Sequence, residues 1–414
     1  MELKPGYKQS EVGVIPEDWS ASTVGEEFHI QLGKMLDAEK NVGISKPFLG
    51  NRAVQWGRID VTDIGLIKLA PSDLQRFRLR DGDLLVCEGG EVGRSAIWCQ
   101  SLDECYYQKA LHRLRPKKGF NVPFMQNILH KYSVEGLLQN YVTQTSIAHL
   151  PKDKFETLPV PVPPPVEQQA IAEALSNADA LIESIDQLLT KKRQIKQGAM
   201  QELLTGQRRL PGFSGEWEKK SVGDVADVKT GPFGSSLHES DYVQSGTPII
   251  TVEHLGEFGV THQNLPLVSD EDRERLGAYS LKAGDIVFSR VGSVDRNALI
   301  REEQDGWLFS GRLLRVRPIH RIVHSPYLSF QFHTWQFKSA VLKVAVGQTM
   351  ASLNTQILKA LYVDVPDIAE QIAIATVLSE MDDDIVNFET QLQKARHLKQ
   401  GMMQELLTGR IRLV

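Results

Sequence analysis

KQGAMQELLTG at residues 196–206 recurs almost unchanged as KQGMMQELLTG at residues 399–409. The two copies differ only where Ala199 in the first corresponds to Met402 in the second. Such a long match about 200 residues further along is typical of chains assembled from repeated structural units. The stretch therefore predicts that the chain contains two copies of one unit.

The repeat extends outward from these two copies along nearly the whole chain. Its offset is 203 residues near the end of each unit, 202 in the middle and 198 at the front. The matched pairs include Glu167 and Glu370, Gln168 and Gln371, Pro163 and Pro366, Arg94 and Arg296, Gly82 and Gly284, and Trp19 and Trp217. The chain is thus one unit of about 205 residues used twice.

The bulk composition limits the class of protein. A chain of 414 residues is too long for one compact core, and 41% hydrophobic with 24% charged residues is ordinary for a soluble globular protein. The sequence shows neither a run of about 18 apolar residues nor a signal peptide, which predicts a cytoplasmic protein without a membrane segment. Cys87, Cys99 and Cys105 lack CxxC spacing and are expected to be free thiols. The net charge of −5 argues mildly against a simple nucleic-acid binder.

Each unit divides into a globular part and a long helix. Short apolar runs such as GDLLVCEGG (82–90) and GDIVFSRVG (284–292) predict short strands in an α+β domain. Proline-rich segments at 158–168 and 363–371 are expected to interrupt strands and to separate domain from helix. The predicted boundaries are a first domain at 1–157, a first helix at 158–206, a second domain at 207–360 and a second helix at 361–414.

The two helical segments carry matching apolar stripes. Both stripes step by four and three residues in turn over about five heptads, which is the 3.5-residue period of a coiled coil. Gly206 and Gly409 follow the stripes and are placed for left-handed C-terminal caps. Each stripe could instead pack only on its own domain, but matched stripes of equal length favour an antiparallel pair with pseudo-twofold symmetry. The predicted core of this pair is Ile171, Leu175, Ile182, Ile185, Leu189, Ile374, Leu378, Met381, Ile385, Phe388 and Leu392.

Motifs for catalysis or cofactor binding are missing from the sequence. It contains neither GxGxxG nor GxxxxGK[ST], so binding of a nucleotide or of S-adenosylmethionine by this chain has no support. His254, His262, His320 and His324 show no metal-ligand spacing with one another or with a cysteine. We therefore expect no catalytic residue, no metal site and no cofactor bound by this chain.

Arginines alternate along two predicted strands. Arg113 and Arg115 form one pair, and Arg315 and Arg317 form the matching pair in the second unit. Period-two spacing places such side chains on one face of a strand, and arginine is well suited to phosphates and to guanine edges. The alternative is that these strand faces are solvated and paired with nearby Asp and Glu.

One segment of each unit does not follow the repeat. Gly33 and Gly82 are 49 residues apart in the first unit, whereas Gly231 and Gly284 are 53 apart in the second. Within this segment NRAVQWGRIDVTD (51–63) has no evident counterpart. A constant frame with one variable segment suits two domains that read different targets with the same geometry.

The order of these features resembles the specificity (S) subunit of type I restriction–modification systems. The resemblance is carried by GYKQSEVGVIPEDW (6–19), LPVPVPPPVEQQAIA (158–172), the two copies of MQELLTG and RRLPGFSGEW (208–217), and it covers the whole chain. It implies two target-recognition domains that each read half of a split, double-stranded DNA sequence. It also implies two long helices that hold these domains apart and dock two methyltransferase (modification) subunits, with restriction (motor-nuclease) subunits in the full complex. The S subunit is then non-catalytic, and adenine-N6 methylation with S-adenosylmethionine belongs to the partner.

We expect the DNA-binding residues in the variable segment and in nearby glycine turns. They are Asn51, Arg52, Gln55, Trp56, Arg58 and Arg94 in the first domain, and Lys229, Ser235, Ser236, Arg290, Ser293 and Arg296 in the second. An internal packing role is the alternative for Trp56 and for the serines. Two other functions stay open: a stand-alone DNA-modifying enzyme, which the missing motifs argue against, and a coiled-coil scaffold that does not bind DNA.

Overall fold

The computed structural model spans residues 1–414 and describes residues 5–37, 41–99, 101–144, 148–232, 239–256, 259–345 and 352–413. The chain separates into two compact units. Unit 1 consists of Met1–Asp186 together with Gln391–Val414, and unit 2 consists of Gln187–Thr390. Each unit therefore holds one globular domain and a part of both long helices.

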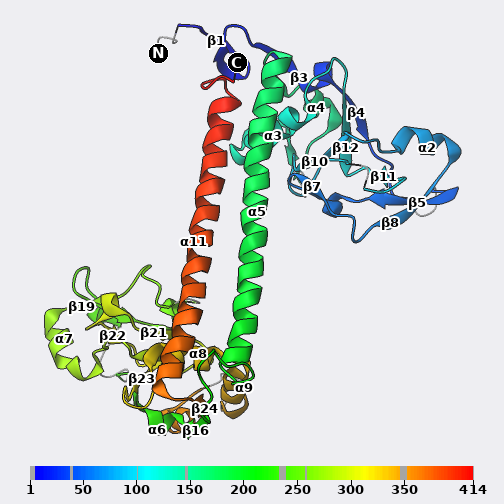
Figure 1. Cartoon of the computed structure of the whole chain (residues 1–414). Helices are drawn as coiled ribbons and strands as arrows, with labels where there is room; N and C mark the ends of the chain where they lie inside the picture. Colours follow the sequence, from blue (N-terminus) through cyan, green and yellow to red (C-terminus); the bar gives the residue numbers. More distant parts are fainter. Residues whose placement is uncertain are drawn as a thin grey trace. The chain divides into compact units, whose positions relative to one another are not determined.

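The domain of unit 1 is built on a four-stranded antiparallel sheet in the order β10-β9-β12-β4 (Figure 1). Its strands are β10 (Ser95–Ile97), β9 (Leu84–Cys87), β12 (Leu111–Pro116) and β4 (Phe28–Leu32). Every residue of β9 is buried, because Leu84 and Val86 belong to one hydrophobic core while Leu85 and Cys87 belong to another. Alternate side chains of a strand point to opposite faces, so a strand between two cores is apolar throughout.

Those two cores are closed by different elements. Helices α3 (Val122–Val134) and α4 (Lys152–Glu156) pack on the first core. The second core is closed by a three-stranded sheet in the order β11-β5-β8. In it β5 (Ile44–Leu49) pairs with β11 (Tyr106–Tyr107) in parallel and with β8 (Gly65–Leu69) in antiparallel fashion.

The domain of unit 2 repeats this arrangement. Its antiparallel sheet has the order β17-β23-β20-β21 and consists of β17 (Ala226–Thr230), β23 (Leu313–Pro318), β20 (Ile286–Ser289) and β21 (Asn297–Leu299). The corresponding smaller sheet has the order β19-β18-β22 and consists of β19 (Leu267–Val268), β18 (Thr247–Ile250) and β22 (Leu308–Phe309). Helix α8 (Ser325–His333) takes the place of α3. The predicted repeat is therefore confirmed as two copies of one α+β domain.

The remaining elements of both domains are short. Unit 1 also contains β1 (Tyr7–Ser10), β2 (Gly13–Pro16), β3 (Ser20–Thr23), α1 (Val24–Glu27), η1 (Asn51–Ala53), β6 (Val54–Gln55), β7 (Arg58–Ile59), α2 (Pro71–Phe77), η2 (Leu137–Tyr141), β13 (Thr143–Gln144), β14 (Ala148–His149) and β15 (Pro159–Val162). Unit 2 also contains β16 (Glu218–Ser221), α6 (Val222–Val225), η3 (Glu239–Asp241), η4 (Val252–His254), α7 (Asp270–Arg275), η5 (Gly277–Tyr279), η6 (Glu302–Gln304), α9 (Trp335–Val344), α10 (Thr355–Ala360) and β24 (Tyr362–Val365).

The first proline-rich segment forms a strand, contrary to the expectation that its prolines interrupt one. Strand β15 pairs antiparallel with β3, and Val160 lies opposite Ser22. In a two-stranded ribbon only every second residue donates to the partner strand, and in β15 valines alternate with prolines. The first long helix begins only at Pro165, a position in the first turn where proline is favoured.

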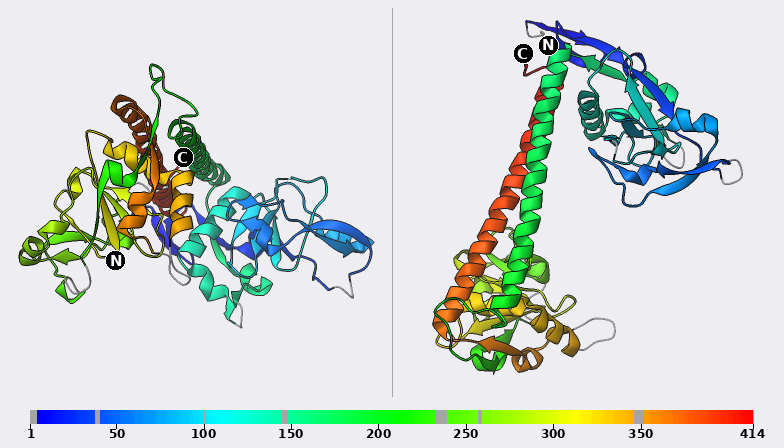
Figure 2. Two further views of the ribbon diagram at one scale, coloured as in Figure 1. Left: turned by 90° about the horizontal axis from the view of Figure 1, so that it is seen from below. Right: turned by 45° about the vertical axis from the view of Figure 1, so that its right-hand side comes forward.

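Two helices of 39 residues each, α5 (Pro165–Leu203) and α11 (Ile368–Leu406), lie side by side (Figures 1 and 2). In unit 1 the ion pairs between them are Asp179 with Lys399 (2.5 Å) and Asp186 with Arg396 (3.7 Å). In unit 2 they are Lys192 with Asp384 (2.6 Å), Arg193 with Glu389 (2.5 Å) and Lys196 with Asp382. From the first to the last of these pairs in each unit, the residue number in α11 falls as the number in α5 rises. The helices are therefore antiparallel, as predicted.

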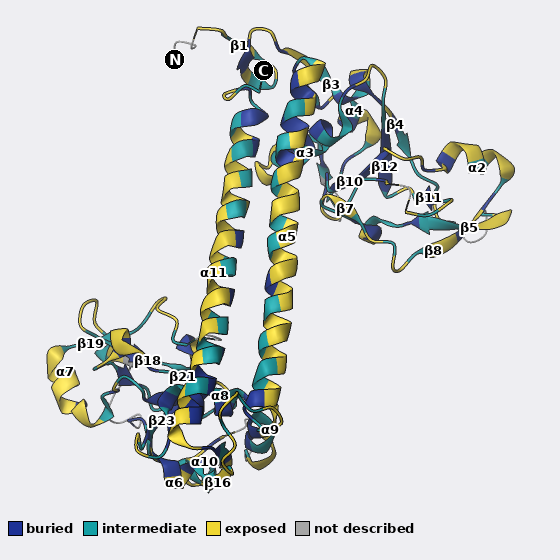
Figure 3. Cartoon of the chain, viewed as in Figure 1, coloured by how far each residue is buried: buried dark blue, intermediate teal, exposed yellow. Residues whose placement is uncertain are grey.

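Burial along the two helices is uneven (Figure 3). Of the predicted core, Ile171, Leu175, Leu189, Ile374, Leu378, Ile385 and Leu392 are buried, while Ile182, Ile185, Met381 and Phe388 are half-buried. Ile171 and Leu175 join the domain core of unit 1 together with Met403 and Leu406 from the other helix. The beginning of the first stripe therefore contacts both its own domain and the other helix.

The predicted helix caps and free thiols are confirmed. Gly206 and Gly409 follow the last helical turns with φ of 71° and 68°, the left-handed conformation in which a side chain would be strained. Cys87, Cys99 and Cys105 are free, and Cys87 and Cys105 are buried.

Candidate nucleic-acid interface

The variable segment of unit 1 folds into a short helical turn followed by a small hairpin. The turn is η1, and the hairpin pairs Gln55 of β6 with Arg58 of β7. Trp56 and Gly57 make the hairpin loop, and Gly57 has a φ of 74° that suits a residue without a side chain. Five of the predicted DNA-binding residues therefore lie within one compact piece of backbone.

Contacts tie this segment to the glycine turn at residues 88–94. The Asn51 amide donates to the Gly89 carbonyl at 2.9 Å, and Arg94 Nη2 donates to the Asn51 carbonyl at 3.1 Å. The Trp56 indole N–H donates to Glu91 at 2.5 Å. The structure thus brings Asn51, Trp56 and Arg94 together, although they are up to 43 residues apart in the sequence.

Trp56 also has a packing role, which was the alternative for this residue. Its ring lies against the imidazole of His130, with ring centroids 4.6 Å apart. His130 belongs to α3, so the hairpin rests on a helix of the frame. The Trp56 side chain is half-buried, and part of its surface stays accessible.

Arg52 and Arg58 present their charges to solvent. Both are exposed, and within the described part of the chain neither side chain makes a hydrogen bond or an ion pair. Gln55 lies between them and donates to the Arg52 carbonyl at 2.7 Å. Exposed guanidinium groups that make no ion pair are suited to phosphate or base contacts. The hydrogen bond from Thr62 and, to a smaller extent, the charge of Arg58 lower the pKa of nearby Asp60.

The predicted residues of unit 2 fall into two places. Arg290, Ser293 and Arg296 lie on the turn between β20 and β21, which corresponds to the glycine turn of unit 1. Lys229 lies on β17, at the opposite edge of the sheet from β21. Its ammonium donates to the Ala278 carbonyl at 2.8 Å and sits 4.8 Å from the centre of the Tyr279 ring. Ser235 and Ser236 lie outside the described residues.

The alternating arginines of the strands point inward and are paired. Arg115 binds Asp83 through two hydrogen bonds of 2.5 and 2.7 Å, and Arg317 binds Asp285 through two of 2.7 Å. Both aspartates are buried, and these hydrogen bonds raise the pKa of each arginine. Arg315 binds Asp227 at 2.6 Å, so pairing with nearby acids, the alternative for these residues, holds for Arg115, Arg315 and Arg317. Arg113 instead donates to the Gln31 side chain at 2.6 Å and to the Arg76 carbonyl at 3.1 Å.

A second repeated feature is a cavity beside the helices in each unit. It has a volume of about 350 Å³ in unit 1 and about 430 Å³ in unit 2. Lining residues matched at the offset of 203 are His130 and His333, Asp179 and Asp382, Ile182 and Ile385, Arg396 and Arg193, Lys399 and Lys196, Gln400 and Gln197, and Met403 and Met200. The Lys, Gln and Met of each set belong to the repeated KQGxMQ stretch. That stretch therefore builds the same surface in both units.

Each cavity contains an ion pair between its matched lysine and aspartate. Lys399 pairs with Asp179 at 2.5 Å, and Lys196 pairs with Asp382. Burial lowers the pKa of His130 and lowers the pKa of His333 to about 3, so both imidazoles are neutral near neutral pH. Paired charges beside apolar walls suit burial against another protein. Sequence analysis did not single out these histidines, although they match at the repeat offset.

The described residues form neither a metal site nor a membrane-spanning helix. No three His, Cys, Asp or Glu side chains among them gather as metal ligands would. None of the helices in the same parts of the chain combines the length and the apolar character that crossing a bilayer requires.

Comparison with known proteins places these features in a family context. The family described as type I restriction modification DNA specificity domain matches residues 16–195 and 214–395. The chain is 22% identical to a protein of Methanocaldococcus jannaschii described as putative type I restriction enzyme MjaX specificity subunit, over 98% of this chain and 97% of that protein. It is 23% identical to the type I restriction enzyme EcoKI specificity subunit of Escherichia coli K12, over 97% and 90%. The solved S subunit of a type I restriction–modification system from M. genitalium matches with a TM-score of 0.63 at 14% identity, over 98% of both chains. This last likeness supports the fold.

Proposed function

The chain belongs to the type I restriction modification DNA specificity family, and from that premise we propose that it is the non-catalytic, DNA-reading subunit of such a system. Each unit reads one half of a two-part double-stranded DNA sequence. One observation carries this proposal: the sheet order repeats between the units, while the segment mounted on it differs. In unit 1 this segment presents Arg52 and Arg58, which are exposed and make no ion pair within the described residues. Exposed cations on such a segment supply the phosphate and base contacts that readout needs.

The partners of the chain follow from its other repeated surface. Two methyltransferase subunits dock on it, one at each cavity built by the KQGxMQ stretch. Identical partners suit this surface because seven of its lining residues are matched between the units. The methyltransferase subunits bind S-adenosylmethionine and transfer methyl groups to adenine N6, and restriction subunits join the full complex. Such a complex works on cellular DNA, which places this chain in the cytoplasm.

Selection of DNA from a random pool tests the proposed function. The chain is co-expressed with the methyltransferase subunit of its own system, and the purified complex selects from random duplexes that are then sequenced. We expect two short fixed sequences separated by a spacer of constant length and free composition. Enrichment of one continuous sequence, or of none, contradicts the proposal. Methyl transfer from labelled S-adenosylmethionine to DNA by the chain alone contradicts its non-catalytic part.

A further inference from the structure

The turn that follows β9 in unit 1 and the turn that follows β20 in unit 2 share part of their backbone conformation, although Gly93 has a φ of 84° and its counterpart Asp295 does not have a positive φ. Gly90 and Gly292 occupy the same place in these turns, with φ of 76° and 75°. In both turns the arginine N–H donates over 3.2 Å to the carbonyl three residues earlier. The repeated frame therefore presents an arginine, Arg94 or Arg296, from the same backbone position in each unit.

Each of these arginines reaches the segment that differs between the units. Arg94 Nη2 donates to the main-chain carbonyl of Asn51, the first residue of η1, at 3.1 Å. Arg296 Nη2 donates to the main-chain carbonyl of Leu255, the residue that follows η4. Asn51 thus begins η1 and Leu255 directly follows η4, two helical turns that each come after a strand of the smaller sheet, and both acceptors are backbone atoms. A backbone carbonyl is present whatever side chain the residue carries.

Contacts around Arg94 extend this anchoring to the hairpin. The Arg94 side chain is 15% exposed, and its Nη1 bonds Glu91 at 3.3 Å. Glu91 in turn accepts the Trp56 indole N–H at 2.5 Å. One guanidinium therefore fixes η1 directly and the loop of the β6–β7 hairpin through Glu91.

We propose that Arg94 and Arg296 are positioning residues for DNA readout, each of which anchors the variable segment of its unit through backbone atoms. This inference rests on the proposed function and goes beyond it. The anchor does not depend on the amino-acid sequence of the segment, so that sequence can change while the segment stays in place. Direct readout requires side chains held to within about 0.5 Å, so a loosened segment reads several bases less strictly. The anchoring role replaces the expected contact between Arg94 and DNA.

A phosphate contact and an anchor predict different binding behaviour. Removal of a phosphate-bound arginine weakens binding to all sequences equally and lowers the slope of log K against log salt by about 0.9. Removal of an anchor leaves that slope unchanged and reduces the preference for the correct bases. The position of the affected bases also matters, because each arginine anchors only the segment of its own unit.

The test uses the complex with the methyltransferase subunit and the two matched variants Arg94→Met and Arg296→Met. Apparent Kd values are measured for the selected duplex and for each single base-pair change, at several salt concentrations. For Arg94→Met we expect about a tenfold loss of discrimination at several positions of one half-site, with the other half and the salt slope unchanged. For Arg296→Met we expect the same loss in the other half-site.

Other outcomes overturn the inference. Unchanged discrimination with a smaller salt slope shows a phosphate contact, and loss at a single base pair shows a direct base contact. Equal loss in both halves shows a general disturbance of the fold. If the Arg94→Met variant does not assemble with its partner, the Arg94→Gln variant is measured instead. Loss of base discrimination in one half-site supports the anchor, and unchanged discrimination in both half-sites contradicts it. If the wild-type complex prefers no sequence, both the proposed function and this inference are overturned. If the Arg94→Met complex discriminates between bases as well as the wild type does, only this inference is overturned.

Discussion

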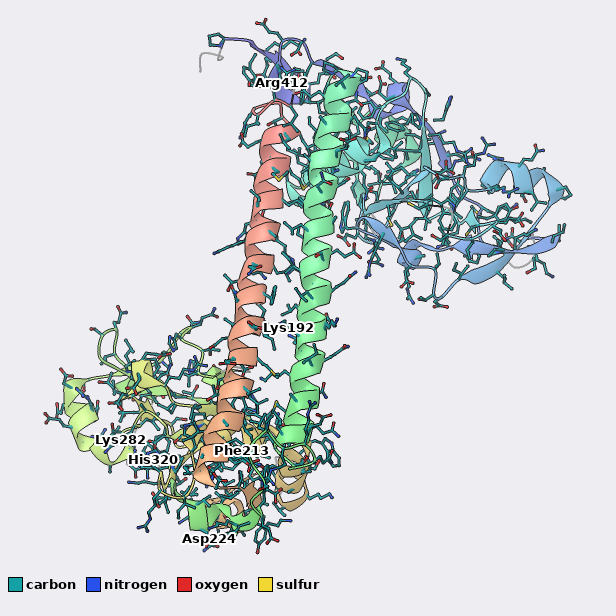
Figure 4. The ribbon with its side chains drawn as sticks, in the orientation of Figure 1. Lys192, Phe213, Asp224, Lys282, His320 and Arg412 are labelled. Atoms are coloured by element: carbon teal, nitrogen blue, oxygen red, sulfur yellow. The ribbon has the colours of Figure 1, made fainter. Side chains whose placement is uncertain are left out.

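Two buried glutamates, Glu167 in unit 1 and Glu370 in unit 2, each bind one tryptophan and one arginine. Glu167 accepts the Trp19 indole N–H at 2.8 Å and Arg412 Nε at 2.7 Å, and Glu370 accepts Arg209 Nε at 2.5 Å and the Trp217 indole N–H at 3.1 Å. In unit 2 the arginine and the tryptophan lie on one continuous stretch of chain. In unit 1 Arg412 lies in the tail beyond α11 (Figure 4), while Trp19 lies near the other end of the sequence. The buried carboxylate of Glu167 thus binds Trp19, near the start of the sequence, and Arg412, near its end, within one unit.

His112 makes the stability of unit 1 depend on pH. It is fully buried, its Nε2 lies 2.9 Å from the Leu150 carbonyl, and burial lowers its pKa to about 4. The unfolded chain has an ordinary histidine pKa of about 6.5 and therefore takes up the proton first as the pH falls. The stability that the neutral imidazole provides is complete above about pH 6.5 and is lost progressively as the pH falls toward 4.

We expect the free energy of unfolding to drop by about 2 kcal/mol more in the parent than in His112→Leu between about pH 7.5 and pH 5. Leucine is the natural comparison because Leu314 occupies the matching position of unit 2. Urea unfolding at the two pH values measures the difference. If the free energy of unfolding falls equally in the parent and in the variant, His112 is not the group that titrates.

Single residues of the candidate site were only partly predictable from the sequence. Asn51, Trp56 and Arg94 were selected because they lie in or near the variable segment, and the structure brings them together. The sequence could not show that Arg94 bonds a backbone carbonyl, because that contact depends on how a distant turn is placed. In the sequence, a strand arginine such as Arg115 looks the same whether it is free to bind DNA or paired within the fold. Only the position of buried Asp83 in the structure shows that Arg115 is paired.

Among the elements, the helices were more predictable than the strands. A 3.5-residue period that holds over about five heptads is typical of paired long helices and of few other structures, and the glycine caps mark its end. Strands such as β9 carry no alternation, because each face lies in a different core. For β15 the prolines gave a misleading signal, since a two-stranded ribbon tolerates proline at alternate positions.

The repeated surface of α5 and α11 leads to a prediction about partner number. Gln400 and Gln197 line the two cavities, are exposed and match at the repeat offset. Tryptophan at either position fills one cavity without disturbing the buried side of its helix. We expect Gln400→Trp and Gln197→Trp each to reduce the complex from two methyltransferase subunits per chain to one, and the double variant to bind none.

Native mass spectrometry of the co-expressed complexes measures this stoichiometry. Gln393→Trp is a matched control, because Gln393 is exposed on α11 and is not among the residues that line the cavities. It should keep two partners. Two partners on the double variant would show that these cavities are not the docking sites, and a single partner on the unmodified chain at saturation would exclude duplicated docking.

For the molecule as a whole, the sequence predicted two copies of one unit but not how the chain is divided between them. Boundaries read along the sequence assign each long helix to the domain before it. In the structure α5 and α11 each contribute to both units, and Glu167 of α5 binds Arg412 from the far end of the chain. A contact between residues 245 positions apart leaves no local pattern in the sequence. Only residues matched by the repeat, the Glu-Gln pairs and Trp19 with Trp217, pointed to it.

The central claim is that one repeated frame carries two independent readers, and a segment exchange tests it most directly. Residues from about 40 to 80 are replaced by the corresponding segment of another family member, and methylated adenines are mapped in the genome of a host that carries the complex. Arg94 and the frame stay unchanged, so the new segment should be anchored like the old one. The account predicts that one half of the methylated sequence changes while the other half and the spacer length stay the same. A methylated sequence in which both halves change, or in which neither does, contradicts it.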